Sequence, residues 1–370
     1  MPITTVLHVD LLHLELHAIA LAAAALAAGK LVAFPTETVY GLGANALDAA
    51  AVERIFAAKR RPHSDPLIVH IAQIEQVEAV ASAVPPDALR LGAALWPGPL
   101  TLVLRRGPAT APNVSGGLNT VAVRVPSHPV AQALLRASGL PVAAPSANLF
   151  TRPSPTTAQH VLDDLDGRID ILLDGGPTTI GLESTVVDMT QDPSVLLRPG
   201  GVAVETLRAL LPHLVVPPQA LVRTEDEAAP GPGMLLKHYS PDTRLLVLAG
   251  SSAAALDVVA EVAGVLRSRG LRLGVLASAE EAPAFAALGA QVVSLGASGD
   301  LETAARLLFT HLRYLEARDV ALILARPLPA TGLGLAISDR LYRASEGQII
   351  DADDLDAAAQ AMAILNPAVI

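Results

Sequence analysis

A segment rich in proline and glycine divides the sequence into two parts, and it constrains the fold more than any other feature. Pro217 and Pro218 begin the segment, an acidic run at residues 225–227 follows, and alternating proline and glycine at residues 230–233 end it. This composition is typical of a linker exposed to solvent. The chain has 370 residues, more than one hydrophobic core usually organises. We therefore expect two domains with a linker between them: residues 1–212, 213–242 and 243–370.

Short β-branched runs alternate with helical patterns in the first part. Residues 31–34 predict a buried strand, and Asp48 is suited to cap a helix over residues 49–60. Strands are also expected at residues 66–72, 100–104, 121–125, 142–144, 169–173, 185–188 and 195–197, and helices at 87–95, 130–137, 156–165 and 205–211. Because strands outnumber crossover helices, we predict an α/β fold with a mixed, partly antiparallel sheet.

The second part has a more regular pattern. Apolar strands are expected at residues 245–248, 273–276, 292–295 and 320–324, with helical segments between them. This alternation predicts a smaller, parallel, Rossmann-like α/β domain.

The composition excludes several classes of site. The chain has no cysteine, which rules out disulfides, thiolate nucleophiles and cysteine-ligated metals and fits a reducing compartment. A net charge of −10 and 3% aromatic residues argue against a protein that coats nucleic acid. The apolar run at residues 18–28 is too short to span a bilayer, and no basic residue precedes Lys30 as in a signal peptide. We expect a soluble, cytoplasmic protein.

Common catalytic motifs are missing. The sequence contains no G-x-x-x-x-G-K-[ST] loop, no complete G-x-G-x-x-G after a strand, no G-x-S-x-G elbow and no H-E-x-x-H pair. A nucleotide would therefore be bound by other means.

Polar residues interrupt the apolar strands of the first part at several places. Thr36 and Thr38 follow the first strand, where α/β sheets bind ligands, although an ordinary strand–helix loop explains them equally well. Ser146 and Asn148 follow a later strand and could bind phosphate or cap a helix. Glu183, Ser184 and Arg198 lie in two segments between apolar strands. A buried arginine needs an anionic partner, either a protein carboxylate such as Glu183 or a ligand.

Basic residues 59–61 gather at the end of a predicted helix. Such residues usually interact with the helix dipole, but three together before a proline suggest a polyphosphate site. Lysine is also rare here, with 3 lysines to 23 arginines, so Lys59 stands out. We expect Lys59 at a solvent-facing helix end, and Arg60 solvated. The residues alone predict a protein that binds anionic small molecules, and they favour a nucleotide.

Taken in order, these segments resemble the threonylcarbamoyl-AMP synthase family. The resemblance rests on residues 35–42, 59–62, 146–148 and 197–200 for the YrdC-like domain, and on residues 230–234 and 237–241 for the linker of its two-domain members. The Lys-x-Arg and Ser-x-Asn signatures read Lys59/Arg61 and Ser146/Asn148. The resemblance covers nearly the whole chain and implies an open, twisted, mixed sheet followed by a Rossmann-like domain.

The resemblance implies a reaction in which L-threonine, bicarbonate and ATP give threonylcarbamoyl-AMP and pyrophosphate. The product would supply a separate transferase that modifies an adenosine next to the tRNA anticodon. Mg²⁺ would be held mainly by the ATP phosphates, with no protein metal site, and RNA contact, if any, would be weak. No covalent enzyme nucleophile is required, which agrees with the missing motifs.

The resemblance also assigns residues to the two substrates. ATP would be bound by Lys59, Arg61, Thr120, Ser146, Asn148, Ser154, Arg198 and Tyr239, with Lys59 and Arg61 central to catalysis and Tyr239 acting as a lid. Threonine would be bound by Thr36, His70, Arg124, Ala144 and Ser184.

Alternatives remain for some residues and for the whole chain. His70 lies in an apolar strand, so a buried core histidine is as good an explanation as a role in the pocket. Hydrogenase-maturation carbamoyltransferases share the YrdC-like domain, but they are much longer and have cysteine-rich zinc segments. An RNA-binding module that uses Lys59 and Arg61 would leave the threonine residues without a purpose.

Overall fold

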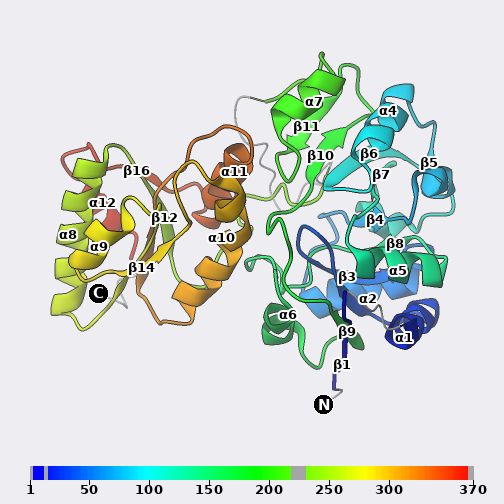
Figure 1. Cartoon of the computed structure of the whole chain (residues 1–370), viewed down its shortest axis with the longest axis horizontal. Helices are drawn as coiled ribbons and strands as arrows, with labels where there is room; N and C mark the ends of the chain where they lie inside the picture. Colours follow the sequence, from blue (N-terminus) through cyan, green and yellow to red (C-terminus); the bar gives the residue numbers. More distant parts are fainter. Residues whose placement is uncertain (1–2, 12–15, 218–230, 366–370) are drawn as a thin grey trace. The chain divides into compact units, whose positions relative to one another are not determined.

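The computed structural model describes residues 3–11, 16–217 and 231–365. It forms two compact units, each with its own sheet: Met1–Phe150 with Ser154–Leu235, and Thr151–Pro153 with Leu236–Ile370 (Figure 1). The division after Leu235 falls within the linker predicted at 213–242. The acidic run at 225–227 lies outside the described residues.

The first unit is built on an 11-stranded sheet in the order β1-β9-β2-β3-β8-β4-β7-β6-β10-β11, with β5 paired to β6. The pairs β2–β9, β4–β7 and β6–β10 are parallel, whereas β2–β3, β3–β8 and β6–β7 are antiparallel, so the mixed sheet is confirmed. Its strands are β1 (Thr5–His8), β2 (Val32–Pro35), β3 (Tyr40–Asn45), β4 (Ile68–His70), β5 (Ala81–Ser82), β6 (Leu100–Arg106), β7 (Thr120–Arg124), β8 (Val142–Ala143), β9 (Ile171–Asp174), β10 (Thr185–Asp188) and β11 (Val195–Arg198).

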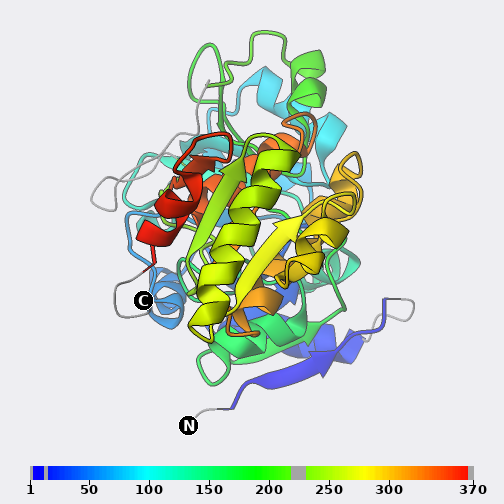
Figure 2. The same ribbon diagram turned by 90° about the vertical axis from the view of Figure 1, so that its left-hand side faces the viewer.

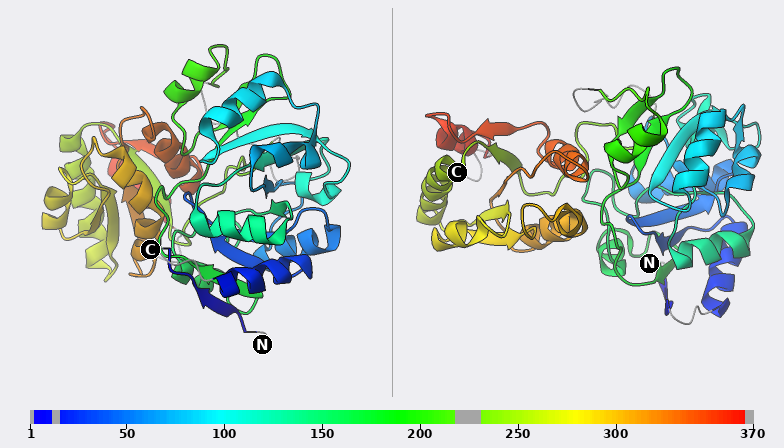
Figure 3. Two further views of the ribbon diagram at one scale, coloured as in Figure 1. Left: turned by 45° about the vertical axis from the view of Figure 1, so that its right-hand side comes forward. Right: turned by 45° about the horizontal axis from the view of Figure 1, so that its top comes forward.

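Helices cover this sheet. They are α1 (Leu16–Ala27), α2 (Ala49–Lys59), α3 (Val77–Val80), α4 (Pro86–Leu95), α5 (Pro129–Ser138), α6 (Ala158–Leu165) and α7 (Val204–Leu210), with 3-10 turns η1 (Ile74–Gln76) and η2 (Pro112–Ser115). α1 and α5 bury their apolar faces together against β2 and β9, which forms one core of the unit (Figure 3). Asp48 caps α2 as predicted, because its Oδ1 accepts hydrogen bonds from the N–H groups of Ala50 and Ala51.

The structure differs from the sequence expectations for the first unit in two places. Residues 40–45, where no strand was expected, form strand β3. Gly43 is needed there because a Cβ atom would lie 2.8 Å from both Phe34 and Val142, so this glycine allows close packing and does not mark a turn. The expectation of a solvent-exposed linker is wrong at its end, where Gly231 and Met234 are buried against β10 and β11.

The second unit contains a 5-stranded, all-parallel sheet in the order β14-β13-β15-β12-β16, as the strand spacing predicted. The strands are β12 (Leu245–Ala249), β13 (Leu273–Ala277), β14 (Gln291–Ser294), β15 (Leu322–Ala325) and the unpredicted β16 (Ile349–Asp351). The helices are α8 (Ser252–Ser268), α9 (Ala282–Ala287), α10 (Leu301–Glu316), α11 (Gly334–Ala344) and α12 (Ala357–Ala363). α8, α9 and α12 cover one face of the sheet and α10 and α11 the other (Figure 2).

No helix among the described residues is both long enough and apolar enough to cross a membrane.

Candidate active site

A tight turn between β2 and β3 carries the first polar residues of the site. The Thr36 hydroxyl donates to the carbonyl oxygen of Val39 at 2.6 Å and accepts the N–H groups of Thr38 and Val39. The hydroxyls of Thr36 and Thr38 lie 2.7 Å apart. These bonds within the turn give Thr36, Glu37 and Thr38 fixed positions, and all three are buried.

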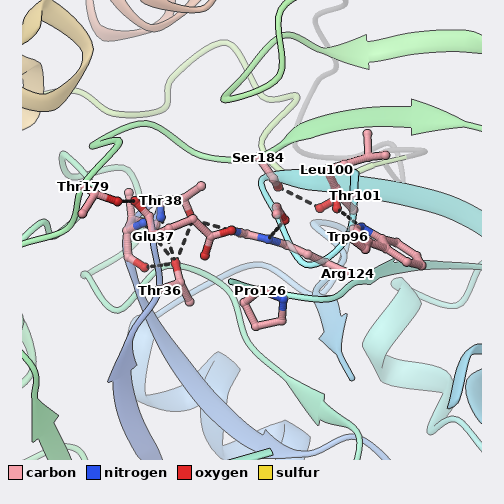
Figure 4. A network of polar contacts seen from close by, with 12 residues as sticks. Thr36, Glu37, Thr38, Trp96, Leu100, Thr101, Arg124, Pro126, Thr179 and Ser184 are labelled. Atoms are coloured by element: carbon pink, nitrogen blue, oxygen red, sulfur yellow. Dashed lines mark hydrogen bonds and ion pairs between the residues drawn. The ribbon is translucent and has the colours of Figure 1, made fainter. Parts of the chain in front are cut away.

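Arg124, at the end of β7, lies in the middle of a buried network (Figure 4). Its Nη2 donates to Glu37 Oε1 at 2.6 Å, its Nη1 to the Thr38 hydroxyl at 2.9 Å, and its Nε to the Gly98 carbonyl at 3.2 Å. Arg124 is therefore a fixed positive charge in the interior, with one carboxylate beside it.

His70 lies on β4, which pairs in parallel with β7. It is in register with Arg124 of β7, so both side chains lie on the same face of the sheet. The imidazole is buried, and its Nδ1 lies 3.2 Å from the Ile68 carbonyl oxygen. Burial, together with the charge of Arg124, lowers the pKa of His70 to about 3. The ring is neutral at physiological pH. Ala144 lies beside this strand, where its N–H donates to the same Ile68 carbonyl at 2.8 Å.

Ser184, just before β10, completes this group. Its hydroxyl lies 2.7 Å from that of Thr101 in β6, as Figure 4 shows. Arg198 donates from Nη2 to the Ser184 carbonyl at 2.9 Å and from Nη1 to the Pro232 carbonyl at 3.2 Å. Arg198 thus connects Ser184 to the end of the linker segment.

Lys59 is buried, contrary to the expectation of a solvent-facing helix end, whereas Arg60 is exposed as expected. The Lys59 ammonium donates to the carbonyl oxygens of Ser146 and Asn148 at 2.6 and 2.5 Å. The segment after β8 folds over the helix end and removes it from solvent. Burial first, and then the charge of Arg61, holds the pKa of Lys59 well below its usual range. The structure thereby brings the Lys-x-Arg and Ser-x-Asn segments together.

Arg61 is held by the loop that follows it. Nε donates to the Asp65 carbonyl at 3.0 Å, Nη2 donates to the Pro66 carbonyl at 2.9 Å, and Nη2 also lies 2.9 Å from Asp65 Oδ2. Asp65 Oδ1 accepts the N–H of Gly233 at 3.2 Å. Asp65 therefore ties the linker end to the basic segment.

The other predicted residues occupy different places. Ser154 is buried and donates to Glu183 Oε1. Thr120 begins β7, four residues from Arg124, which corresponds to roughly 13 Å along a strand. Tyr239 belongs to the second unit, where it is buried, stacks on Phe309 at a centroid distance of 5.5 Å and lies 4.9 Å from the Arg340 guanidinium.

Glu37 and Asp65 were not among the residues chosen from the sequence. Glu37 carried a signal that could have found it, since a charged residue stands between two threonines directly after a buried strand. Asp65 follows Arg61 by four residues, but only the folded loop shows that they pair. No cluster of three or more histidine, aspartate or glutamate side chains suited to a metal ion occurs in the part of the chain that the structure describes.

Two family models match consecutive parts of the sequence. The Sua5, YciO and YrdC family, described as "Telomere recombination", matches residues 24–200. The threonylcarbamoyl-AMP synthase C-terminal domain matches residues 202–346.

Relatives and solved structures resemble the chain over most of its length. The threonylcarbamoyl-AMP synthase of Pyrococcus abyssi is 44% identical over 322 residues, which cover 87% of this chain and 92% of that protein. The enzyme of the same name from Bacillus subtilis is 46% identical, with coverage of 87% and 91%. The crystal structure of P. abyssi Sua5 complexed with L-threonine has 43% sequence identity and a TM-score of 0.87, covering 94% of this chain and 99% of that one.

Proposed function

The chain belongs to the threonylcarbamoyl-AMP synthase family, and from this premise we propose how its residues divide the work on the two substrates. The protein is an enzyme that makes threonylcarbamoyl-AMP from L-threonine with consumption of ATP. One observation carries the residue roles: Lys59 binds the carbonyls of both Ser146 and Asn148, so the two signature segments form one buried basic site.

The phosphates of ATP are proposed to bind at Lys59 and Arg61. An ammonium has three N–H donors and Lys59 uses two on carbonyls, so one is left for a phosphate oxygen. Arg61 uses Nε and Nη2, and its Nη1 makes no hydrogen bond to any described residue. Fixed cations with spare donors stabilise the charge that develops when pyrophosphate leaves. The Ser146 and Asn148 side chains, with Thr120, Ser154 and Arg198, are proposed to complete the nucleotide site.

Threonine is proposed to bind at the Arg124 network. Arg124 offers a planar guanidinium for the substrate carboxylate, and Thr36 and Ser184 offer hydroxyls. His70, neutral because of its lowered pKa, and Ala144 would form the wall of the pocket. A neutral imidazole can accept or donate a hydrogen bond to the threonine hydroxyl without adding a second positive charge beside Arg124.

The proposed chemistry takes its carbon from bicarbonate. The threonine amine condenses with bicarbonate to a carbamate, with loss of water. A carbamate oxygen then forms a bond to the α-phosphorus of ATP, and the bond from that phosphorus to the bridging oxygen of pyrophosphate breaks. No side chain forms a covalent bond, so the protein acts by holding two anions in position and excluding water from labile intermediates.

Mg²⁺ is proposed to bind mainly through the ATP phosphates. Protein sites that act on nucleotides usually give Mg²⁺ one or two carboxylates and leave the rest to phosphate and water. Asp65 is a carboxylate at this site, and it is already paired with Arg61. The metal would add positive charge at the phosphates when bound.

The product is proposed to pass to a separate transferase for tRNA modification next to the anticodon, in the cytoplasm. The absence of cysteine fits a reducing compartment, and a net charge of −10 favours at most a weak contact with RNA.

For Tyr239 the lid role implied by the resemblance remains a prediction. If the Tyr239 ring closes over the intermediate, Tyr239→Phe, which keeps the ring, should release or hydrolyse less intermediate than Tyr239→Ala.

Pyrophosphate release tests the function directly. We expect release from ATP and Mg²⁺ only when both threonine and bicarbonate are present, with a product of threonylcarbamoyl-AMP mass. Release without threonine would indicate another acceptor or simple ATP hydrolysis. Nucleotide binding without any release would favour a binding module.

A further inference from the structure

The Arg124 guanidinium has not used all of its hydrogen-bonding capacity. A guanidinium carries five N–H donors. Three of them bind Glu37, Thr38 and the Gly98 carbonyl, which leaves two, one on each Nη atom, with no partner in the part of the chain that the structure describes. Arg124 can therefore hold Glu37 and still bind a second carboxylate.

One carboxylate oxygen of Glu37 lacks a hydrogen-bond donor. Its Oε1 accepts from Arg124, but its Oε2 is buried and has no hydrogen-bond partner among the described residues. The close-up in Figure 4 shows the glutamate carboxylate lying end-on to Arg124, with its second oxygen directed away from the guanidinium. Leaving a buried, charged acceptor without a donor is costly, so a donor supplied by a ligand would be bound strongly.

The groups around Glu37 do not supply that donor. Thr179 and Ile180 donate to the Glu37 backbone carbonyl and not to its carboxylate. His128 lies close by, but its Nδ1 accepts the N–H of Val130, burial lowers its pKa, and its ring makes no hydrogen bond to Glu37 Oε2.

We propose that Glu37 is a specificity-determining residue that binds the α-ammonium of threonine through Oε2 while Arg124 binds the α-carboxylate. An α-amino acid carries its ammonium and its carboxylate on the same carbon, and Glu37 and Arg124 offer an acceptor and donors side by side. The pair therefore selects the zwitterion of an amino acid. The proposal rests on the proposed function, because it requires threonine to bind at Arg124.

The test measures calorimetric affinities of the full-length protein for L-threonine and for (R)-3-hydroxybutyrate, which is threonine without its amino group. We expect the wild type to bind threonine at least 10-fold more tightly, as a charge-assisted hydrogen bond would give. Glu37→Gln should reduce this preference to within about threefold, mostly through weaker threonine binding, because a neutral amide replaces the charge. Glu37→Asp keeps the charge and should keep a preference.

A matched control comes from the second unit. Glu281 also pairs with an arginine, Arg326, at 3.0 Å, so Glu281→Gln removes the same charge from a similar pair. This variant should leave both affinities unchanged.

Three results would overturn the proposal. Equal affinities of the wild type for the two ligands would do so without any variant. Equal losses for both ligands in Glu37→Gln would mean that Glu37 only holds Arg124 in place. Threonine binding that Arg124→Gln leaves unchanged would instead remove the proposed pocket itself, so the two failures can be told apart.

Discussion

Two buried arginines, one at the sheet of each unit, use their hydrogen bonds differently. Arg326 follows β15 and donates from Nε to Glu281, from Nη1 to the carbonyls of Leu248 and Ala249, and from Nη2 to Gly250. Four of its five donors are thus used inside the unit. Among the described residues Arg124 uses three, and its glutamate partner keeps one oxygen without a donor.

The comparison separates a structural ion pair from the pair that we propose binds threonine. The carboxyl end of a parallel sheet is where α/β proteins usually bind ligands, but in the second unit Arg326 ties three successive carbonyls together at that end. Arg124 is as buried as Arg326, and Glu37 is more buried than Glu281, yet the Arg124–Glu37 pair is incompletely bonded among the described residues. Unused donors next to an unused acceptor, and not burial or charge alone, mark the site in the first unit.

Replacing each arginine by glutamine should give the largest and most contrasting effects. Arg124→Gln should weaken threonine binding by more than about 100-fold, because the substrate carboxylate loses its partner. Arg326→Gln should leave threonine affinity within about twofold but reduce the free energy of unfolding by about 3–5 kcal/mol, since Glu281 loses its partner. Calorimetry and urea unfolding of both variants check this. A similar loss of threonine affinity in the two variants would show that Arg124 and Arg326 do not differ in role.

Lys59→Met should reduce pyrophosphate release by about 100- to 1,000-fold, since it removes a fixed cation from the proposed phosphate site. It should also destabilise the first unit by roughly 1–3 kcal/mol for each buried carbonyl, at Ser146 and Asn148, that loses its donor. Steady-state release and thermal unfolding measure the two effects. Turnover within twofold of the wild type would show that Lys59 has only a structural role, like Arg326.

His70 should make the stability of the first unit depend on pH. Its folded pKa of about 3 lies below the ordinary value of 6.5, so between these values the unfolded chain binds one proton more. The stabilisation is complete above pH 6.5 and is lost as the pH falls, by up to about 1.4 kcal/mol per pH unit. Between pH 6.5 and 5 the wild type should therefore lose about 2 kcal/mol more than His70→Asn in urea titrations. Parallel curves for the two proteins would contradict a buried neutral imidazole.

Helix caps should have the smallest effects, and these should be alike in the two units. Asp48→Ala removes the cap of α2, and Ser251→Ala removes that of α8. Each should cost about 1 kcal/mol of stability, although Ser251→Ala also removes the hydroxyl's bond to Asp353 Oδ1, and each should change threonine affinity by less than twofold, because neither cap residue hydrogen-bonds to the Arg124 network. Chemical denaturation and calorimetry measure both quantities, and a large affinity change in either variant would extend the site beyond the Arg124 network.

Local signals predicted much of the fold. The strand at Thr185–Asp188 and the Asp48 cap were read correctly because their patterns depend on neighbouring residues. β3 was not predicted, because the reason for Gly43 is the approach of Phe34 and Val142 from other strands, which the local sequence does not show. Non-local packing decided that case.

Contacts between residues far apart in the sequence also decided the geometry of the site. The chosen residues came from short motifs, but the burial of Lys59 depends on a segment almost 90 residues away in the sequence. The pairing of Glu37 with Arg124 joins residues separated by 87 positions. No single-sequence pattern covers such distances, so the sequence could name many of the participants, but neither Glu37 nor the unused hydrogen-bonding groups that distinguish the site.

A crystal structure of this protein with L-threonine would test the central claim most directly. We predict that both Arg124 Nη atoms lie within about 3.2 Å of the threonine carboxylate, that Glu37 Oε2 lies within about 3.2 Å of its nitrogen, and that the Arg326 contacts are unchanged. Threonine bound away from Arg124, or with its nitrogen on other acceptors while Glu37 Oε2 stays without a partner, would contradict the account.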